Sequence, residues 1–370
     1  MRITTVELRR VRLPFLAPFR TSAGSTEGRE VLLVRIDTTA GEGWGECAAL
    51  GEPTYTAEYV AGAAGVLRDH LVPRLLAVGG EVGATAVAPA LAAVRGHHMA
   101  KAALEMAVLD VELRAAGISL AQRLGATRDT VEAGVAVGIA PSIGALLDVV
   151  GGAVDDGYRR VKLKIEPGWD VEPVRAVRER FGDLVLQVDA NGAYRIGDAA
   201  QLALLDPFDL AMIEQPLPPD DLAGSAHLAR RIATPICLDE PITSAEVAAG
   251  VLAMGAAAVI NVKAGRVGGY LEAARVHDVC LAAGVPVWCG GMLETGYARA
   301  ANLALAALPG FTLPGDLCPP SRYLAADVAA PLLAPGGRLQ VPSQPGLGAD
   351  LLAEAIEAHT TATELAYPSR

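Results

Sequence analysis

From residue 131 onward, short apolar runs alternate along the chain with stretches of helical periodicity. Short runs of this kind are typical of buried strands, and helices between them are typical of consecutive βα units in a parallel sheet. The pattern therefore predicts an α/β barrel over residues 126–320. Its eight runs lie at 134–139, 160–165, 184–190, 210–216, 234–240, 257–263, 285–291 and, less regularly, 311–315.

Residues 1–125 show a different order, with strand-like stretches first and helical periodicity afterwards. This order predicts a separate α+β unit. The segment 321–370 is rich in proline and glycine, ends in a polar helix-like stretch and is too short for a domain, so we expect it to pack back on the first unit. The strand-like stretches are 4–13, 30–38 and 43–50, and the helical ones are 56–76 and 98–117.

The connection between the first two strand-like stretches, PFLAPFRTSAGSTEG at 14–28, is long for neighbouring strands, which are usually joined by two to five residues. One interpretation is a lid in which Phe15 or Phe19 covers an apolar ligand. The other is a variable surface loop. The sequence leaves both open.

Composition and charge limit the classes of partner. Of 370 residues, 52% are hydrophobic and 20% charged, which argues against a disordered chain. The net charge of −11 argues against nucleic acid or an anionic membrane surface as a main partner, because these need clustered lysine and arginine. No 18 apolar residues run together, so we expect no membrane span. Five cysteines without CxxC spacing favour reduced thiols in a cytoplasmic protein.

The run RRVKLKIEPGWD at 159–170 contains an unusual pair of lysines. Val161, Leu163 and Ile165 alternate as in a buried strand. Lys162 and Lys164 have the opposite parity, so both ammonium groups point to the other side of the same strand. Such an arrangement requires a source of negative charge on that side.

Ionisable residues close five consecutive runs, at intervals of 25, 25, 25 and 24 residues, which is one βα unit each time. In a parallel barrel, the carboxyl ends of the strands meet at the face where these enzymes place their active sites. We therefore expect one cluster at this face, formed by Lys164, Asp189, Glu214, Asp239 and Lys263.

Three clustered carboxylates would repel one another unless a cation lies among them. Oxygen ligands select a hard ion, Mg²⁺ first, with Mn²⁺ or Ca²⁺ less favoured. Three carboxylates, one divalent ion and the lysines at 162, 164 and 263 sum to +2, so the site would attract a carboxylate or dicarboxylate substrate. Glu240 follows Asp239 directly, and strand alternation points it away from the metal or behind its ligands.

A lysine near a metal ion and another lysine has its charged form disfavoured, so its pKa should fall and it can act as a base. Lys164 and Lys263 would flank the metal from opposite sides of the barrel. The predicted reaction is abstraction of the proton α to a carboxylate through an enediolate that Mg²⁺ stabilises.

These residues resemble the enolase superfamily, and the pattern KLK…DAN…EQP…DE…K resembles its muconate-lactonizing subgroup. Seven motifs across nearly the whole chain resemble the o-succinylbenzoate synthase / N-succinyl (N-acyl) amino acid racemase family. They are APFRTS, GEGWGEC, MAKAALEMAVLD, KLKIEPGWDVEPVR, TPICLDE, GRVGGYLEA and VWCGGMLETG.

The resemblance implies a modified (β/α)₇β TIM-type barrel with an α+β N-terminal capping domain. It also implies either a syn dehydration in menaquinone biosynthesis or racemisation by one lysine on each face of the α-carbon. Members are commonly dimeric to octameric, which suggests a homo-oligomer.

Carried over to matching positions, the resemblance also implies a role for individual residues. Asp189, Glu214 and Asp239 would bind Mg²⁺, and Lys164 and Lys263 would form the acid/base pair. Lys162 would help to bind the substrate carboxylate and would lower the pKa of Lys164. Asn191 would support the metal ligands, and Arg266 would lie behind them. Gly291 and Met292 would line the pocket for the distal part of the substrate. Arg266 could equally be a surface residue at the start of a helix.

Three alternatives stay open at this point. A muconate-type cycloisomerase or a dipeptide epimerase would use the same superfamily chemistry. A Schiff-base aldolase on a similar barrel would need no metal, and a binding protein would catalyse no α-proton exchange.

Overall fold

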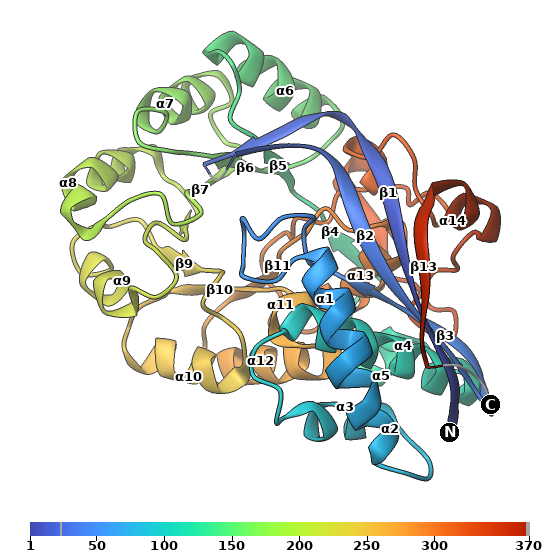
Figure 1. The fold of residues 1–370 in the computed structure, drawn as a ribbon. Helices are drawn as coiled ribbons and strands as arrows, with labels where there is room; N and C mark the ends of the chain where they lie inside the picture. Colours follow the sequence, from blue (N-terminus) through green and yellow to red (C-terminus); the bar gives the residue numbers. More distant parts are fainter. Residues whose placement is uncertain (23, 368–370) are drawn as a thin grey trace.

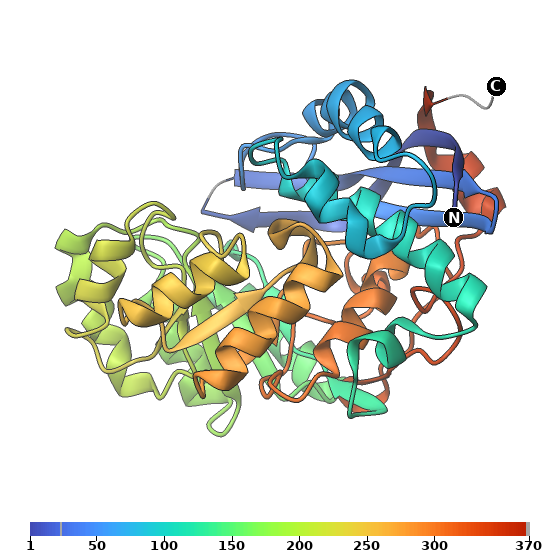
Figure 2. The ribbon, with the colours of Figure 1, turned by 90° about the horizontal axis from the view of Figure 1, so that it is seen from below.

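The computed structural model describes residues 1–22 and 24–367, and shows a parallel barrel beside an antiparallel sheet (Figures 1 and 2). The antiparallel sheet has the strand order β13-β1-β2-β3. Its strands are β1 (Ile3–Thr21), β2 (Gly24–Thr38), β3 (Gly41–Cys47) and β13 (Thr360–Tyr367).

Helices of the first 125 residues cover this sheet. They are α1 (Val60–Val66), the π-helical η1 (Leu67–Leu71), α2 (Val72–Ala77), α3 (Ala84–Leu91), α4 (His98–Ala116) and α5 (Leu120–Leu124). Helix α4 lies directly against β3. A Cβ atom at Gly45 would lie 1.9 Å from the carbonyl oxygen of Ala103, so only glycine allows this close approach.

The parallel sheet contains seven strands in sequence order, as the alternation of runs and helices predicts. The strands are β5 (Val135–Val137), β6 (Arg160–Lys164), β7 (Val185–Asp189), β8 (Ile213–Glu214), β9 (Ile236–Leu238), β10 (Val259–Val262) and β11 (Val287–Cys289). Between and after them lie α6 (Ile143–Asp155), α7 (Val171–Arg180), η2 (Ile196–Asp198), α8 (Ala199–Leu202), η3 (Ala203–Phe208), α9 (Leu222–Leu228), α10 (Ala245–Ala253), α11 (Ala264–Val267), α12 (Tyr270–Ala282) and α13 (Gly296–Ala306).

The eighth run does not form a regular strand. Instead, segment 310–316 bridges the two ends of the sheet, because Phe311 pairs with Val287 and Gly315 pairs with Ala133, both in parallel. Pro314 lacks the N–H that a continuous ladder needs, which explains the interruption. The bridges nevertheless close the curled sheet on itself.

The connection at 14–28 is a β-hairpin and not a loop. Phe19 pairs with Thr26 and Pro14 with Gly28, with an irregular register between Pro14 and Phe19. Proline is tolerated there because β13 pairs with β1 only from Val6 to Val11, and beyond Val11 this edge of β1 carries an isolated bridge, between Phe15 and Leu324, that does not use a proline N–H. Phe15 is buried between the sheet and the C-terminal segment, with its ring edge-on to Tyr323 at 6.3 Å.

The C-terminal segment contains η4 (Pro320–Arg322), η5 (Pro335–Gly337), β12 (Arg338–Gln340) and α14 (Ala353–His359). Strand β12 pairs with β4 (Thr130–Glu132) below the barrel. The chain then returns to the first unit as β13, where Tyr367 pairs with Val6. Among the described residues, no helix is long and apolar enough to cross a membrane.

Candidate active site

The five ionisable residues that close the runs lie at the carboxyl ends of successive barrel strands. Lys164, Asp189 and Glu214 are the last residues of β6, β7 and β8, and Asp239 and Lys263 directly follow β9 and β10. All five are at most 8% exposed. The sheet register places Lys164 opposite Asp189, and Asp189 opposite Glu214, so the charges are immediate neighbours.

The two lysines of β6 are held by carboxylates on the inside of the barrel. Lys164 Nζ donates to Asp189 Oδ2 at 2.6 Å and to the side-chain oxygen of Asn191 at 2.6 Å. Lys162 Nζ lies 2.8 Å from Glu214 Oε2, 3.2 Å from Asp189 Oδ2 and 2.6 Å from Asp316 Oδ2. The negative charge that the paired lysines require is therefore present on their side of the strand.

Lys263 lies on the other side of the barrel mouth, and three strands separate it from the strand of Lys164 in the sheet order. Its ammonium group donates to Asp239 Oδ2 at 2.8 Å and to the hydroxyl of Tyr55 at 2.9 Å. Tyr55 in turn donates to Asp239 Oδ2 at 3.0 Å. Tyr55, which belongs to the first 125 residues, thus contacts both Asp239 and Lys263 of the barrel.

Arg266 is buried behind Asp239 and is not a surface arginine, since only 2% of it is exposed. Its guanidinium contacts Asp239 Oδ1 and the hydroxyl of Tyr55, the latter at 2.9 Å. It also donates to the backbone oxygens of Ile242 at 3.0 Å and Asn261 at 2.7 Å. These four contacts fix the orientation of the Asp239 carboxylate.

Asn191 and Glu240 lie beside the carboxylates. The backbone N–H of Asn191 donates to Asp189 Oδ1 at 3.0 Å, and its side chain donates to Glu240 Oε1 at 3.0 Å. Glu240 Oε2 is buried and has no hydrogen-bond partner among the described residues. Glu240 therefore faces the cluster from behind Asn191, in agreement with the expectation from strand alternation.

Burial and mutual charge shift the pKa values of the cluster in opposite directions. Burial, reinforced by Asp189, raises the pKa of Glu214 to about 8. Burial acts against ionisation of Asp189 as well, but the ammonium groups of Lys164 and Lys162 outweigh it and lower that pKa. For Lys263, burial is outweighed by the Asp239 carboxylate, so its pKa is raised. The sequence predicts a lower pKa for a lysine beside a metal ion. For Lys263 the Asp239 carboxylate dominates instead and raises the pKa.

The donor set suits a hard divalent cation, although each acid is paired with a basic side chain in this structure. No three His, Cys, Asp or Glu side chains within residues 1–22 and 24–367 are gathered closely enough to hold a metal ion. All candidate ligands are oxygens, which Mg²⁺ prefers. Among the described residues, Asn261 Oδ1 and Glu240 Oε2 are buried oxygens without a hydrogen-bond partner, and burial together with Asp189 disfavours the charged form of Glu214, which a cation would favour. These chemical features fit Mg²⁺.

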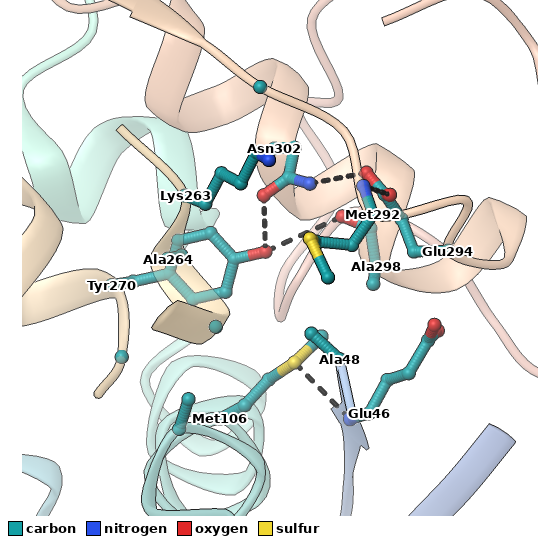
Figure 3. A pocket seen from close by; sticks show the side chains of 14 residues that line it. Glu46, Ala48, Met106, Lys263, Ala264, Tyr270, Met292, Glu294, Ala298 and Asn302 are labelled. Carbon is teal, nitrogen blue, oxygen red and sulfur yellow. Dashed lines mark hydrogen bonds between the residues drawn. The ribbon is translucent and has the colours of Figure 1, made fainter. Parts of the chain in front are cut away.

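A small cavity adjoins Lys263 between the barrel and the antiparallel sheet (Figure 3). Its volume is about 30 Å³, enough for a water molecule. Met292 lines it, while Gly291 instead packs against the backbone of Asp316, where an added Cβ would lie 2.7 Å from the carbonyl oxygen. Polar groups in the wall include Glu46, Tyr270, Glu294 and Asn302.

The tip of the β1-β2 hairpin reaches the same barrel mouth. Arg20 pairs with Glu166 at 2.7 Å, and its carbonyl oxygen accepts from the backbone N–H of Ile139 at 2.9 Å. Ser22 donates to the backbone oxygen of Ala190, next to Asp189, at 3.0 Å. Phe19 is half-buried, and its ring lies 3.6 Å from the position of a Cβ at Gly138.

Three residues of the site were missed by sequence reasoning. Asp316 directly follows the irregular eighth run, as the other acids follow theirs, so its position was a usable signal. Asn261 has the parity of Lys263 on the same strand and donates to Glu214 Oε1 at 2.6 Å. Tyr55 lies in the first 125 residues, and no pattern in the sequence connects it with the barrel.

Comparisons with known proteins agree with this architecture. Residues 3–125 match the mandelate racemase / muconate lactonizing enzyme N-terminal domain, and residues 145–355 match the enolase C-terminal domain-like family. The chain therefore belongs to the mandelate racemase / muconate lactonizing enzyme family of the enolase superfamily. Members of this superfamily generally use Mg²⁺.

Individual relatives cover nearly the whole chain. An N-succinylamino acid racemase of Amycolatopsis is 60% identical over 98% of this chain and 98% of its own. An o-succinylbenzoate synthase of Geobacillus kaustophilus is 44% identical over 98% and 97%. The solved structure of an enolase superfamily member from Listeria innocua matches with a TM-score of 0.94 at 38% identity, over 99% of both chains.

Proposed function

We propose that this enzyme abstracts the proton α to a carboxylate, acting as an o-succinylbenzoate synthase, as an N-succinyl (N-acyl) amino acid racemase, or as both. The main support is the placement of Lys164 and Lys263 on strands β6 and β10, with the Asp189, Glu214 and Asp239 carboxylates at the ends of the three strands between them. A substrate carboxylate held among these groups would present its α-carbon to a lysine on each face. The names of the 60% and 44% identical relatives support the same two activities.

In this proposal Lys164 and Lys263 are the acid/base pair. Asp189, Glu214 and Asp239 would hold Mg²⁺, which supplies positive charge where the substrate carboxylate becomes more negative. Lys162 would attract the substrate carboxylate without moving a proton, because its ammonium group is already bonded to three carboxylates. Asn191, Glu240 and Arg266 would orient the metal ligands through the contacts described above.

The distal part of the substrate would lie between the barrel mouth and the hairpin tip. Met292 in the cavity wall and the half-buried Phe19 would supply apolar surface there, and Gly291, whose close packing against Asp316 excludes a side chain, would lie beside Met292. The proposed substrates are therefore small carboxylates, either a cyclohexadiene dicarboxylate or an N-succinyl amino acid. The homo-oligomeric state and a cytoplasmic location are proposed as well, the latter supported by five free, buried cysteines.

Hydrogen–deuterium exchange at the α-carbon tests the proposal. The enzyme is incubated with each enantiomer of an N-succinyl amino acid in D₂O with Mg²⁺, alongside a dehydration assay on the synthase substrate. Both enantiomers should incorporate deuterium. Lys164→Ala and Lys263→Ala should each abolish racemisation and retain exchange of at most one enantiomer, opposite in the two variants. Retention of exchange for both enantiomers in Lys164→Ala would contradict the assignment of the bases.

The alternatives predict different results in the same assays. A muconate-type cycloisomerase or dipeptide epimerase would leave both substrates unchanged, and the relatives at 44–60% identity do not favour these activities. A Schiff-base aldolase would be inactivated by borohydride in the presence of a carbonyl substrate and would tolerate EDTA. A binding protein would show no deuterium incorporation with either enantiomer.

A further inference from the structure

Asp316 closes the inner surface of the barrel at the position of the eighth run. The residue is only 8% exposed, and its carboxylate lies between two basic side chains of β6. Asp316 Oδ1 accepts from Arg160 at 2.6 Å, and Asp316 Oδ2 lies 2.6 Å from Lys162 Nζ. The backbone oxygen of Asp316 is bonded by Arg299, which fixes the segment that carries the carboxylate.

The ammonium group of Lys162 has three donors, and the structure gives it three carboxylate acceptors. Two of them belong to Glu214 and Asp189, at 2.8 and 3.2 Å, which are proposed metal ligands. Asp316 is the third and the nearest, and its other side-chain partner among the described residues is Arg160, which is not a proposed metal ligand. It therefore competes with two metal ligands for one positive charge.

We propose that Asp316 is a positioning residue for the metal site, and that it holds the Lys162 ammonium away from Glu214 and Asp189 so that these carboxylates can bind a divalent cation. The inference rests on the proposed function, because it presupposes that Glu214 and Asp189 are metal ligands. The ligand that these carboxylates would bind is a hard divalent cation, and Mn²⁺ serves as the experimental probe for it.

Two observations support this role. First, the centroid of the Trp288 ring lies 4.8 Å from Lys162 Nζ, so the ammonium group has a favourable contact that does not involve the metal ligands. Second, five basic and five acidic buried side chains meet around these strand ends, and they balance in formal charge. They are Arg160, Lys162, Lys164, Lys263 and Arg266 against Asp189, Glu214, Asp239, Glu240 and Asp316.

Removal of the Asp316 charge would change this balance to +1 and leave Lys162 with the two metal ligands as its only carboxylate partners. Both effects oppose the entry of a divalent cation, and both act in a buried site where charges are poorly screened. A purely structural role of Asp316 would involve Arg160 instead, and would change the free energy of unfolding without a specific effect on cation affinity.

The test is a double-mutant cycle on cation affinity, with no substrate present. Mn²⁺ binding is measured from the paramagnetic resonance of the free ion for the wild type, Asp316→Asn, Lys162→Met and the double variant. Asp316→Asn should weaken Mn²⁺ binding about tenfold, equivalent to about 1.4 kcal/mol. In the Lys162→Met background the same substitution should weaken Mn²⁺ binding clearly less, because only the change in charge balance remains. If Lys162→Met does not fold, Lys162→Gln replaces it in the cycle.

Asp170→Asn is the matched control, because Asp170 is a buried aspartate of the same barrel, bonded to Tyr194 and Gln201 away from the metal site. It should leave Mn²⁺ affinity unchanged. If Asp316→Asn binds Mn²⁺ like the wild type, or weakens it equally with and without Lys162, the inference is wrong. The proposed function fails separately, if the wild type and Glu214→Gln bind Mn²⁺ alike.

Discussion

Tyr55 donates a hydrogen bond to Asp239 across the boundary between the antiparallel sheet unit and the barrel, with 3.0 Å between the two oxygens. The same hydroxyl accepts from Lys263 and from Arg266, each at 2.9 Å. One side chain from outside the barrel therefore orients a proposed base and a proposed metal ligand together. Burial raises the pKa of Tyr55 above its ordinary value, so the hydroxyl keeps its proton and remains a donor.

Replacement of Tyr55 by phenylalanine should lower activity with little loss of stability. The variant retains the ring and loses one hydroxyl with three hydrogen bonds, while Lys263, Asp239 and Arg266 still bond to one another. A net loss of about 1 kcal/mol in the orientation of these groups corresponds to a five- to tenfold lower kcat/KM. Steady-state kinetics together with thermal unfolding checks this. An unchanged kcat/KM would show that the hydroxyl does not orient Lys263.

The two lysines of β6 should differ in what their loss affects. Lys164→Met should lower kcat by roughly 10² to 10⁴, the usual contribution of a general acid or base. Lys162→Met should mainly destabilise the fold, by about 3 kcal/mol, since it removes the ammonium group shared by three buried carboxylates. Turnover and chemical denaturation are measured for both variants. If Lys162→Met loses as much turnover as Lys164→Met, with fold and substrate binding intact, the division of roles is wrong.

Removal of divalent cations should abolish turnover reversibly. Treatment with EDTA followed by gel filtration is expected to leave a folded protein without α-proton exchange. Added Mg²⁺ should restore exchange, and Mn²⁺ should restore it at least in part, because both ions accept oxygen ligands. Far-ultraviolet circular dichroism confirms that the fold persists. Full activity after EDTA treatment would exclude a role for the metal in the reaction.

Glu46 should make stability fall as the pH rises toward neutrality. Burial raises its pKa to about 7 from an ordinary 4.5, although the hydroxyl of Thr295 donates to it at 2.5 Å. Between these two values the folded state holds a proton that the unfolded state has lost, so unfolding becomes easier with rising pH. The effect of this one group is about 3 kcal/mol at most. Glu46→Gln should remove that contribution and be more stable than the wild type at pH 8.

Denaturation of both proteins between pH 5 and 8 measures the difference directly. Glu42→Gln is the matched control, because Glu42 lies on the same strand and is exposed. It should leave the pH dependence of the wild type unchanged. An equal pH dependence for Glu46→Gln and the wild type would contradict the assignment.

Local periodicity explains why much of the barrel could be predicted. The parity of Val161 and Lys162 determines which side chains face inward, and a repeat of about 25 residues places Lys164, Asp189 and Glu214 at the same height. The parity follows from strand geometry and is visible in a few residues, whereas the spacing follows from the length of one βα unit and repeats along the chain.

Contacts between distant segments explain what could not be predicted. Tyr55 reaches Asp239 only because of how the two units pack together, and Asp316 belongs to a segment that bridges strands without forming one. The length of the connection at 14–28 suggested a lid or a variable surface loop, whereas β1 and β2 continue through most of it and pair as a hairpin. Such information becomes available only when the neighbouring strands are known.

The pairing of β1 with β13 has a consequence for the order in which the protein folds. The partner of Val6 is Tyr367, so β1 is synthesised long before the strand that completes its pairing. Until then one edge of β1 is open, and contacts of such long range form slowly. The barrel strands, by contrast, find their neighbours within one βα unit each. We therefore expect the barrel to fold first during synthesis, and the antiparallel sheet to be completed only when β13 has been synthesised and pairs with β1.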